Sequence, residues 1–268
     1  MVKVESLQYD TIFKKAFCHV DLFTGLVKDF TDIHLEIDEV EHEKVFEPPI
    51  GHVRARFDLF AEDKKNRVIV EAQHASNTDD FDRFFYYHII AMAETIRRLK
   101  NYCFPKVVIT LVFFTEKKTP KPDRNILIQD SEIRDLAGNV VEKVHGFKHR
   151  LIFIFTGDPL SDWNVPKPCF EWIEAINDTL DEEADENEYD NPLIKQLFQI
   201  ISKDKTTPEE YAHMKEEYNQ RQILVNGQKK IRLEAARECL LLSDKLTEQE
   251  MAKITGLTVD DIRALSTQ

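Results

Sequence analysis

In residues 57–87, which read FDLFAEDKKNRVIVEAQHASNTDDFDRFFYY, two strand patterns, a polar turn and a helix start follow one another. Hydrophobic and polar residues alternate from position 52 to 61, as is typical of a half-buried strand. Side chains repeat every second residue along a strand. We therefore expect Phe57 and Leu59 on one face and Asp58 on the other.

A second strand follows the polar turn at residues 62–66. It spans residues 67–74, and its period predicts that Ile69, Glu71 and Gln73 share a face. The simplest arrangement of the two strands is a hairpin, which would put Asp58 opposite or diagonally near Glu71. Facing carboxylates repel each other unless a cation lies between them. Magnesium suits such a pair, since it is held by one or two carboxylates and retains water.

The spacing of Asp58, twelve further residues, then Glu71-x-Gln73 resembles the PD-(D/E)XK nuclease signature, with Gln73 in place of the usual lysine. Three blocks narrow the resemblance, namely YDTIFKKAF at 9–17, VIVEAQ at 68–73 and DRFFYYHIIAMAE at 82–94. Together they are similar to the Rpn family of recombination-promoting nucleases and transposase-like proteins, over residues 1 to about 157.

The resemblance implies an α/β protein with a restriction-endonuclease-like mixed sheet flanked by helices. It also implies magnesium-dependent endonucleolytic cleavage of DNA in recombination or mobile-element movement, with manganese as a possible substitute. Asp58 and Glu71 would be the metal ligands. In the usual site a lysine orients and polarises the attacking water. Gln73 adds no charge, so either the metal alone activates the water or Lys14 supplies the charge.

The first and third blocks contribute the other candidate residues. The resemblance places Asp10 and Lys14 in the site, whereas the alternative is an exposed ion pair one helical turn apart. Arg83 would contact a phosphate, with Tyr87 holding the phosphate or the water. The alternative is that Arg83 pairs with Asp79 while the tyrosine packs at the edge of the core.

Two other classes of function stay open. One keeps the fold without catalysis, as a DNA-binding or protein-interaction module in which Asp58 and Glu71 are an unoccupied pair. The other is a structural partner that acts through its acidic segment and C-terminal helices. The facing carboxylates favour the enzyme, because a surface strand gains nothing from them.

Charge is unevenly distributed along the 268 residues, whose net charge is −13. Residues 171–190 hold ten acids and no Lys or Arg, and residues 191–268 are balanced, which leaves −3 for residues 1–170. A nearly neutral domain can approach DNA once a metal adds charge, although no broad basic surface is expected. We expect DNA as the partner, and a homodimer would suit cleavage of both strands.

We expect a nuclease-like domain over residues 1–160 and a helical extension over 161–268. Further strands are predicted at 35–46, 106–115 and 150–155, with a peripheral hairpin from 125–129 and 140–144. A helix after residue 78 should lie across the sheet with Phe81, Phe85 and His88 in its apolar stripe. The extension comprises an acidic segment (171–190), helices at 193–201, 208–223 and 231–242, and a helix-turn-helix-like tail (231–268). Asp260 and Asp261 disfavour base reading by its last helix.

Several classes of protein are excluded by missing patterns. Without G-x-x-x-x-G-K-[ST] or G-x-G-x-x-G there is no support for a nucleotide cofactor. The four cysteines have no zinc spacing, so we expect reduced, mostly buried thiols. No apolar run approaches a membrane span, so we expect a cytoplasmic protein.

Overall fold

The computed structural model describes residues 1–47, 53–74, 80–97, 103–116, 123–131, 133–141, 147–157, 164–242 and 246–266. The chain divides into two compact units, Met1–Met214 and Lys215–Gln268. Within the described residues, no helix combines the length and the apolar character needed to cross a membrane.

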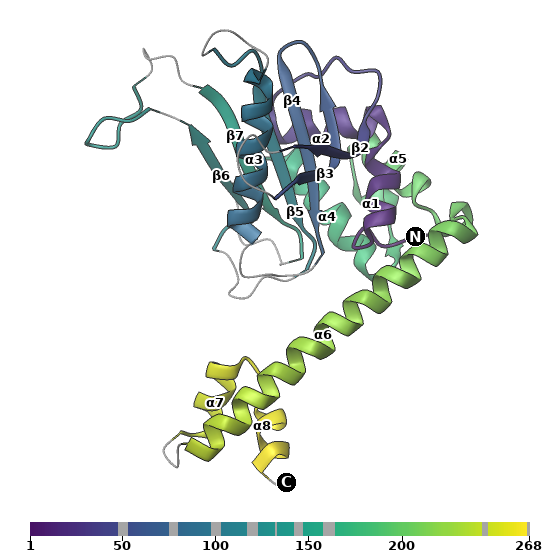
Figure 1. Ribbon diagram of the computed structural model, residues 1–268. Coiled ribbons are helices and arrows are strands. Elements are labelled where there is room, and N and C mark those ends of the chain that lie inside the picture. Colours follow the sequence, from purple (N-terminus) through teal and green to yellow (C-terminus); the bar gives the residue numbers. More distant parts are fainter. Residues whose placement is uncertain are drawn as a thin grey trace. The chain divides into compact units, whose positions relative to one another are not determined.

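A six-stranded mixed sheet forms the centre of the first unit, in the order β2-β3-β4-β5-β7-β6 (Figure 1). Strand β4 is parallel to β5 and β5 is parallel to β7, while the other neighbours are antiparallel. The bounds are Glu41–Phe46 (β2), Ala55–Glu62 (β3), Asn66–Gln73 (β4), Val107–Phe114 (β5), Ile126–Ser131 (β6) and Phe147–Phe155 (β7). The predicted hairpin of β3 and β4 and the buried β5 are confirmed.

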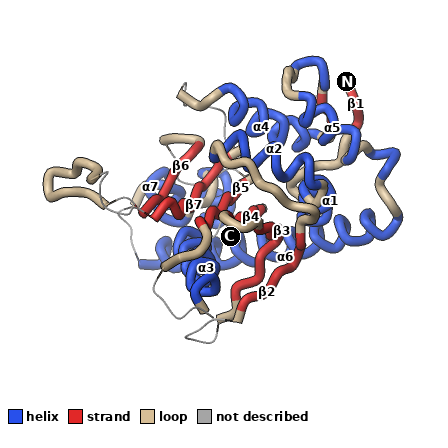
Figure 2. Tube along the Cα trace, turned by 90° about the horizontal axis from the view of Figure 1, so that it is seen from above, coloured by secondary structure: helices blue, strands red, loops and turns tan. Residues whose placement is uncertain are grey.

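Helices cover both faces of this sheet. Helix α3 (Asp80–Ile96) lies across one face, and the other carries α1 (Asp10–Phe17), α2 (Val20–Thr31), α4 (Lys167–Asp178) and α5 (Pro192–Ile200) (Figures 1 and 2). The main core lies between the sheet and these four helices, and two smaller, aromatic-rich clusters lie under α3. The mixed α/β sheet flanked by helices is as predicted.

The regular alternation predicted for β3 is wrong at one position. Phe57 packs in the cluster under α3, whereas Leu59 packs in the main core on the opposite face. The face changes at Asp58, where the pairing with β4 has ended and the pairing with β2 skips one position. The stripe predicted for α3 is also partly wrong, because Phe84 is buried while Phe81 and Phe85 are each 41% exposed. Because α3 carries many aromatic residues, the hydrophobic period alone did not identify its buried face.

Other predicted elements differ in extent. Strand β2 begins at Glu41 rather than residue 35, and β6 pairs with β7 rather than with residues 140–144, of which 142–144 lie outside the described residues. Of the described cysteines, Cys169 is buried, Cys18 is half-buried and Cys103 is exposed. The expectation of mostly buried thiols is therefore wrong for Cys103.

Residues beyond 160 contribute to the core of the first unit. Leu197 from α5 is fully buried in the main core, and so is Trp172 from α4, which belongs to the acidic segment. This segment also contains the 3-10 helices η1 (Thr179–Asp181) and η2 (Glu186–Glu188) and the short strand β8 (Glu183–Ala184), which pairs with β1 (Val2–Lys3). A third 3-10 helix, η3 (Lys203–Lys205), follows α5.

The C-terminal helices are α6 (Pro208–Leu242), α7 (Glu248–Thr255) and α8 (Val259–Ser266). Helix α6 is continuous where two helices were predicted, because a single glycine, Gly227, does not interrupt a helix. Capping boxes at Thr247 with Glu250 and at Thr258 with Asp261 begin the last two helices.

Candidate functional site

The site begins where β3 and β4 separate. Their backbone pairing ends at Leu59 and Val70, and the next positions in register are Asp58 and Glu71. The backbone N–H of Asp58 donates to Glu71 Oε1 at 3.3 Å, and the N–H of Ala72 donates to Asp58 Oδ2 at 3.1 Å. The two carboxylates therefore replace the backbone ladder, and they face each other as the sequence predicted.

A third acid lies at the same level on β2. The pairs His42–Leu59 and Lys44–Phe57 leave Glu43 opposite Asp58. Glu43 has a φ of 57°, in the left-handed region that non-glycine residues rarely adopt. Glu43, Asp58 and Glu71 thus form an acidic row across three adjacent strands, at the point where the ladder is interrupted on both sides.

Helix α1 brings a cation to the acidic row. Lys14 Nζ lies 2.7 Å from Asp10 Oδ2 and 3.5 Å from Asp58 Oδ1, and it also pairs with Glu43. The Lys14 side chain is only 15% exposed, so the alternative of a simple exposed ion pair with Asp10 does not describe it. Arg56 pairs with the other oxygen of Glu43, which extends the network toward solvent.

Helix α3 supplies the remaining predicted residues. The Arg83 guanidinium donates to Gln73 Oε1 and lies 4.5 Å from the centre of the Phe84 ring. Tyr87 packs against Phe57 at the edge of the core. Asp79, the alternative partner of Arg83, lies outside the described residues. Gln73 is therefore held by Arg83 from α3.

Burial and mutual repulsion disfavour negative charge in this region. Burial, followed by the charge of Asp58, raises the pKa of Glu71 well above its ordinary value. Burial and then the Asp10 charge raise the pKa of Asp58, while Lys14 opposes the change. Burial and then the Glu71 charge raise the pKa of Tyr87. A proton or a further cation would therefore be stabilised between the carboxylates.

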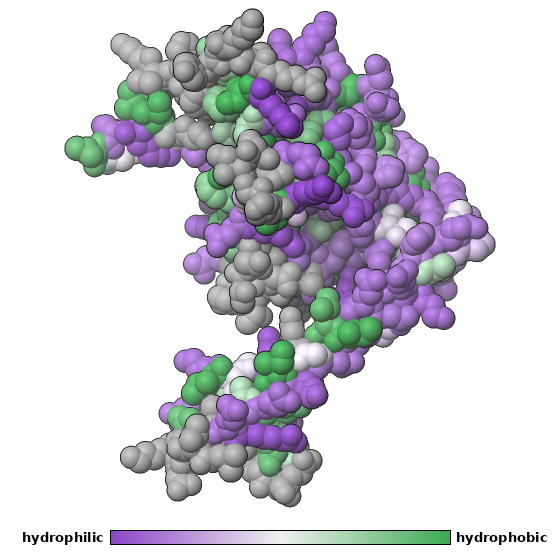
Figure 3. Space-filling model, in the orientation of Figure 1, coloured by the Kyte–Doolittle hydropathy of each residue, from purple (hydrophilic) through white to green (hydrophobic). Residues whose placement is uncertain are grey.

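These residues line one pocket of about 380 Å³. Its lining consists of Asp10, Lys14, Glu43, Arg56, Asp58, Glu71, Ala72, Gln73, Arg83, Phe84 and Tyr87. All seven residues that the sequence nominated are among them. Hydrophilic side chains predominate on the part of the surface around α1 and β2 (Figure 3).

Two residues of the pocket, Glu43 and Arg56, were not among those predicted from the sequence. Arg56 is a polar residue two positions before Asp58, a signal that could have drawn attention to it. Glu43 gave no signal, because its strand alternates poorly and its contact with Lys14 joins residues 29 positions apart.

The donor groups fit a hard divalent cation such as magnesium. They are carboxylate oxygens, the ligands that this ion prefers, and burial raises the pKa of both Asp58 and Glu71. Among the described residues, no group of three or more His, Cys, Asp or Glu side chains is placed to hold a metal ion. The residues that would hold an ion here are Asp58 and Glu71, whose carboxylates face each other.

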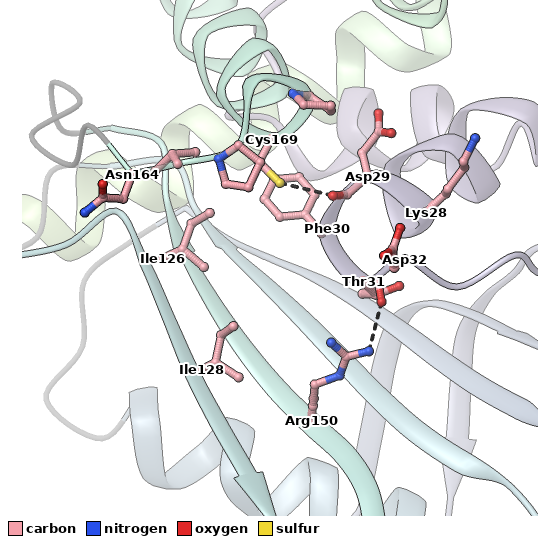
Figure 4. Close-up of a pocket in the computed structure, with 13 residues that line it drawn as sticks. Lys28, Asp29, Phe30, Thr31, Asp32, Ile126, Ile128, Arg150, Asn164 and Cys169 are labelled. Atoms are coloured by element: carbon pink, nitrogen blue, oxygen red, sulfur yellow. Dashed lines mark hydrogen bonds between the residues drawn. The ribbon is translucent and has the colours of Figure 1, made fainter.

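A second pocket, of about 740 Å³, lies between the C-terminal end of α2, strands β6 and β7 and the start of α4 (Figure 4). Its lining includes Phe30, Ile126 and Ile128 and none of the residues that the sequence nominated. Arg150 Nη2 donates to the Thr31 carbonyl at 2.9 Å, which satisfies the end of α2. These contacts serve the fold, so we assign no chemistry to this larger pocket.

Comparisons of the chain with models of known protein families, with curated proteins and with solved structures found no match. Any assignment of family or activity therefore rests on the chain's own motifs and on the geometry of the pocket.

Proposed function

We propose that this protein is a magnesium-dependent DNA endonuclease of the Rpn type, with a restriction-endonuclease-like fold. The observation that carries the proposal is the convergence, in one pocket, of two facing carboxylates, a lysine and an arginine from four separate elements. The pocket lies where the backbone pairing of β3 with β4 ends.

Each side chain has a role that follows from its position. Asp58 and Glu71 would hold magnesium, or manganese in its place, and the ion would lower the pKa of the attacking water and offset phosphate charge. Lys14, beside Asp58, supplies the positive charge that Gln73 lacks. Arg83 contacts the phosphate, and Tyr87 donates a hydrogen bond to the phosphate or water.

The electrostatics of the pocket support this assignment over a purely structural one. Holding Asp58 and Glu71 face to face in a buried position costs stability, and both pKa values rise as a result. A cation bound between them would recover that cost. This arrangement is what a site for a divalent ion requires.

The positively charged side chains of the pocket favour DNA as the substrate. A phosphodiester brings negative charge to a pocket that already holds Arg56, Arg83 and Lys14. With a net charge of −3 over residues 1–170, the domain should bind duplex DNA weakly until the metal is present. A homodimer would place two such pockets on the two strands.

Cleavage of supercoiled plasmid by the purified full-length protein tests the proposal, with magnesium, manganese or a chelator. We expect metal-dependent nicking that falls by about 10²-fold or more in Asp58→Ala and in Glu71→Ala, since removing a direct ligand should exceed the effect of an outer partner. Glu41→Gln is the matched control, because Glu41 is an exposed residue of β2 whose ion pair among the described residues is with Lys44.

A second candidate function follows if wild type and variants leave the plasmid equally intact while circular dichroism shows folded protein. The protein would then be a catalytically inactive DNA-binding or protein-interaction module. One observation favours it: Lys14 already pairs with Asp58, and Arg83 already holds Gln73.

A further inference from the structure

The backbone of Glu43 is unusual for a residue within a strand. Three described non-glycine residues have a positive φ, and the other two, Asp32 and Glu182, follow the last residue of a helix, where this conformation is common. Glu43 instead lies inside β2, directly opposite Asp58. A strained residue is retained only where its surroundings determine it, and such residues gather at functional sites.

The contacts of Glu43 show what this conformation achieves. One carboxylate oxygen pairs with the Lys14 ammonium group and the other pairs with Arg56. Lys14 is at the same time 2.7 Å from Asp10 and 3.5 Å from Asp58. Asp10 from α1 and Glu43 from β2 thus both hold the ammonium group that lies beside Asp58.

We propose that Glu43 is a positioning residue, which holds the Lys14 ammonium group at Asp58. The inference rests on the proposed function for its catalytic consequence, since Lys14 is the cation that replaces the missing lysine at Gln73. Without Glu43, the long and flexible Lys14 side chain keeps its helical neighbour Asp10 and the longer 3.5 Å contact with Asp58, and a pair one helical turn apart holds an ammonium group only weakly. Arg56 in turn fixes the Glu43 carboxylate.

Chemical labelling of lysines tests the placement of Lys14 without any measurement of activity. The full-length protein is treated with acetic anhydride, and the labelling rate of each lysine is followed by mass spectrometry. We expect Lys14 to react more slowly than Lys44, and its rate to rise severalfold in Glu43→Gly and in Glu43→Gln. Glycine tolerates the positive φ, so Glu43→Gly removes the carboxylate without disturbing the backbone.

Asp32→Gly is the matched control. It relieves a similar positive φ of 64° outside the pocket and should leave Lys14 labelling unchanged. If Lys14 labelling is also unchanged in both Glu43 variants while each remains folded, the inference is overturned.

Kinetics then separate positioning from stability. We expect kcat to fall about tenfold or more in Glu43→Gly, with KM for DNA unchanged, because the loss concerns charge near the attacking water. Unchanged kcat alongside faster Lys14 labelling would overturn the catalytic consequence. If wild type cuts no DNA under any metal, the proposed function fails, and the labelling rates alone still decide whether Glu43 holds Lys14.

Discussion

Glu71 is the most deeply buried acid of the pocket, at 4% exposure, and its ionisation opposes folding. Its folded pKa is raised, first by burial and then by Asp58, so the folded state retains a proton that the unfolded chain has lost. Stability is therefore fully present below the ordinary glutamate pKa and decreases as pH rises through the raised value, by about 1.4 kcal/mol for each pKa unit.

Replacing Glu71 by glutamine should accordingly stabilise the metal-free protein at neutral pH. Urea denaturation in the presence of chelator measures the change. Glu62→Gln is an informative comparison: burial acts to raise the pKa of Glu62, but the hydrogen bond and charge of Arg67 outweigh it and lower that pKa. Glu62→Gln should therefore destabilise the protein. A loss of stability in Glu71→Gln would contradict the interpretation of the acidic row.

Lys14 and Gln73 together permit a second test at the level of residues. We expect Lys14→Ala to lower kcat by about tenfold or more, because the attacking water loses its nearby positive charge. Adding Gln73→Lys to that variant should restore part of the activity, since position 73 is where the nuclease signature carries its lysine. Plasmid nicking rates measure both effects. Gln73→Met in the same background is the control, and recovery by methionine as large as by lysine would refute the charge argument.

The packing of helix α3 on β5 makes a prediction about acid sensitivity. His88 on α3 is 5% exposed and its Nδ1 lies 2.9 Å from the Thr110 hydroxyl on β5. Burial, and then the proximity of His149, lowers the pKa of His88 to about 4. Because the folded state binds this proton less readily than the unfolded chain, stability is present above about pH 6.5 and is lost as pH falls toward 4.

The expected loss from His88 is about 3 kcal/mol between pH 7 and pH 4, from the difference between its folded and unfolded pKa values. Denaturation of His88→Gln across this range should show a flatter pH profile than wild type. His42→Gln provides the control, because His42 is exposed on β2 and should leave the profile unchanged. A profile in His88→Gln as steep as that of wild type would show that other groups control acid unfolding.

The same elements show how far the sequence could predict this molecule. Local period and turn composition located β3, β4 and β5 to within three residues at each end, since each strand has its own apolar pattern. The face change at Asp58 could not be predicted, because it arises from interrupted pairing with two other strands. Glu43 was missed for the same reason: its partner Lys14 is distant in sequence, and a positive φ leaves no mark on the alternation.

At the scale of the whole molecule, the two compact units differ in the size of their cores. The first unit buries a large cluster against one face of the sheet and two more under α3. In the second, the described side chains give a core of three buried residues, Ala236, Met251 and Ile262, with four partly buried neighbours. Since apolar burial is the main driving force for folding, the second unit should be the less stable.

Native-state hydrogen exchange should therefore separate the two units. We expect amides of α7 and α8 to exchange by local opening at a lower free energy than those of β4 and β5, whose opening requires unfolding of the main core. Met251→Ala removes a buried side chain and should lower the stability of the second unit by about 2–5 kcal/mol. Exchange should then accelerate in α7 and α8 alone. If exchange in β4 and β5 accelerated equally, the chain would unfold as one cooperative unit, and the division after Met214 would carry no energetic meaning.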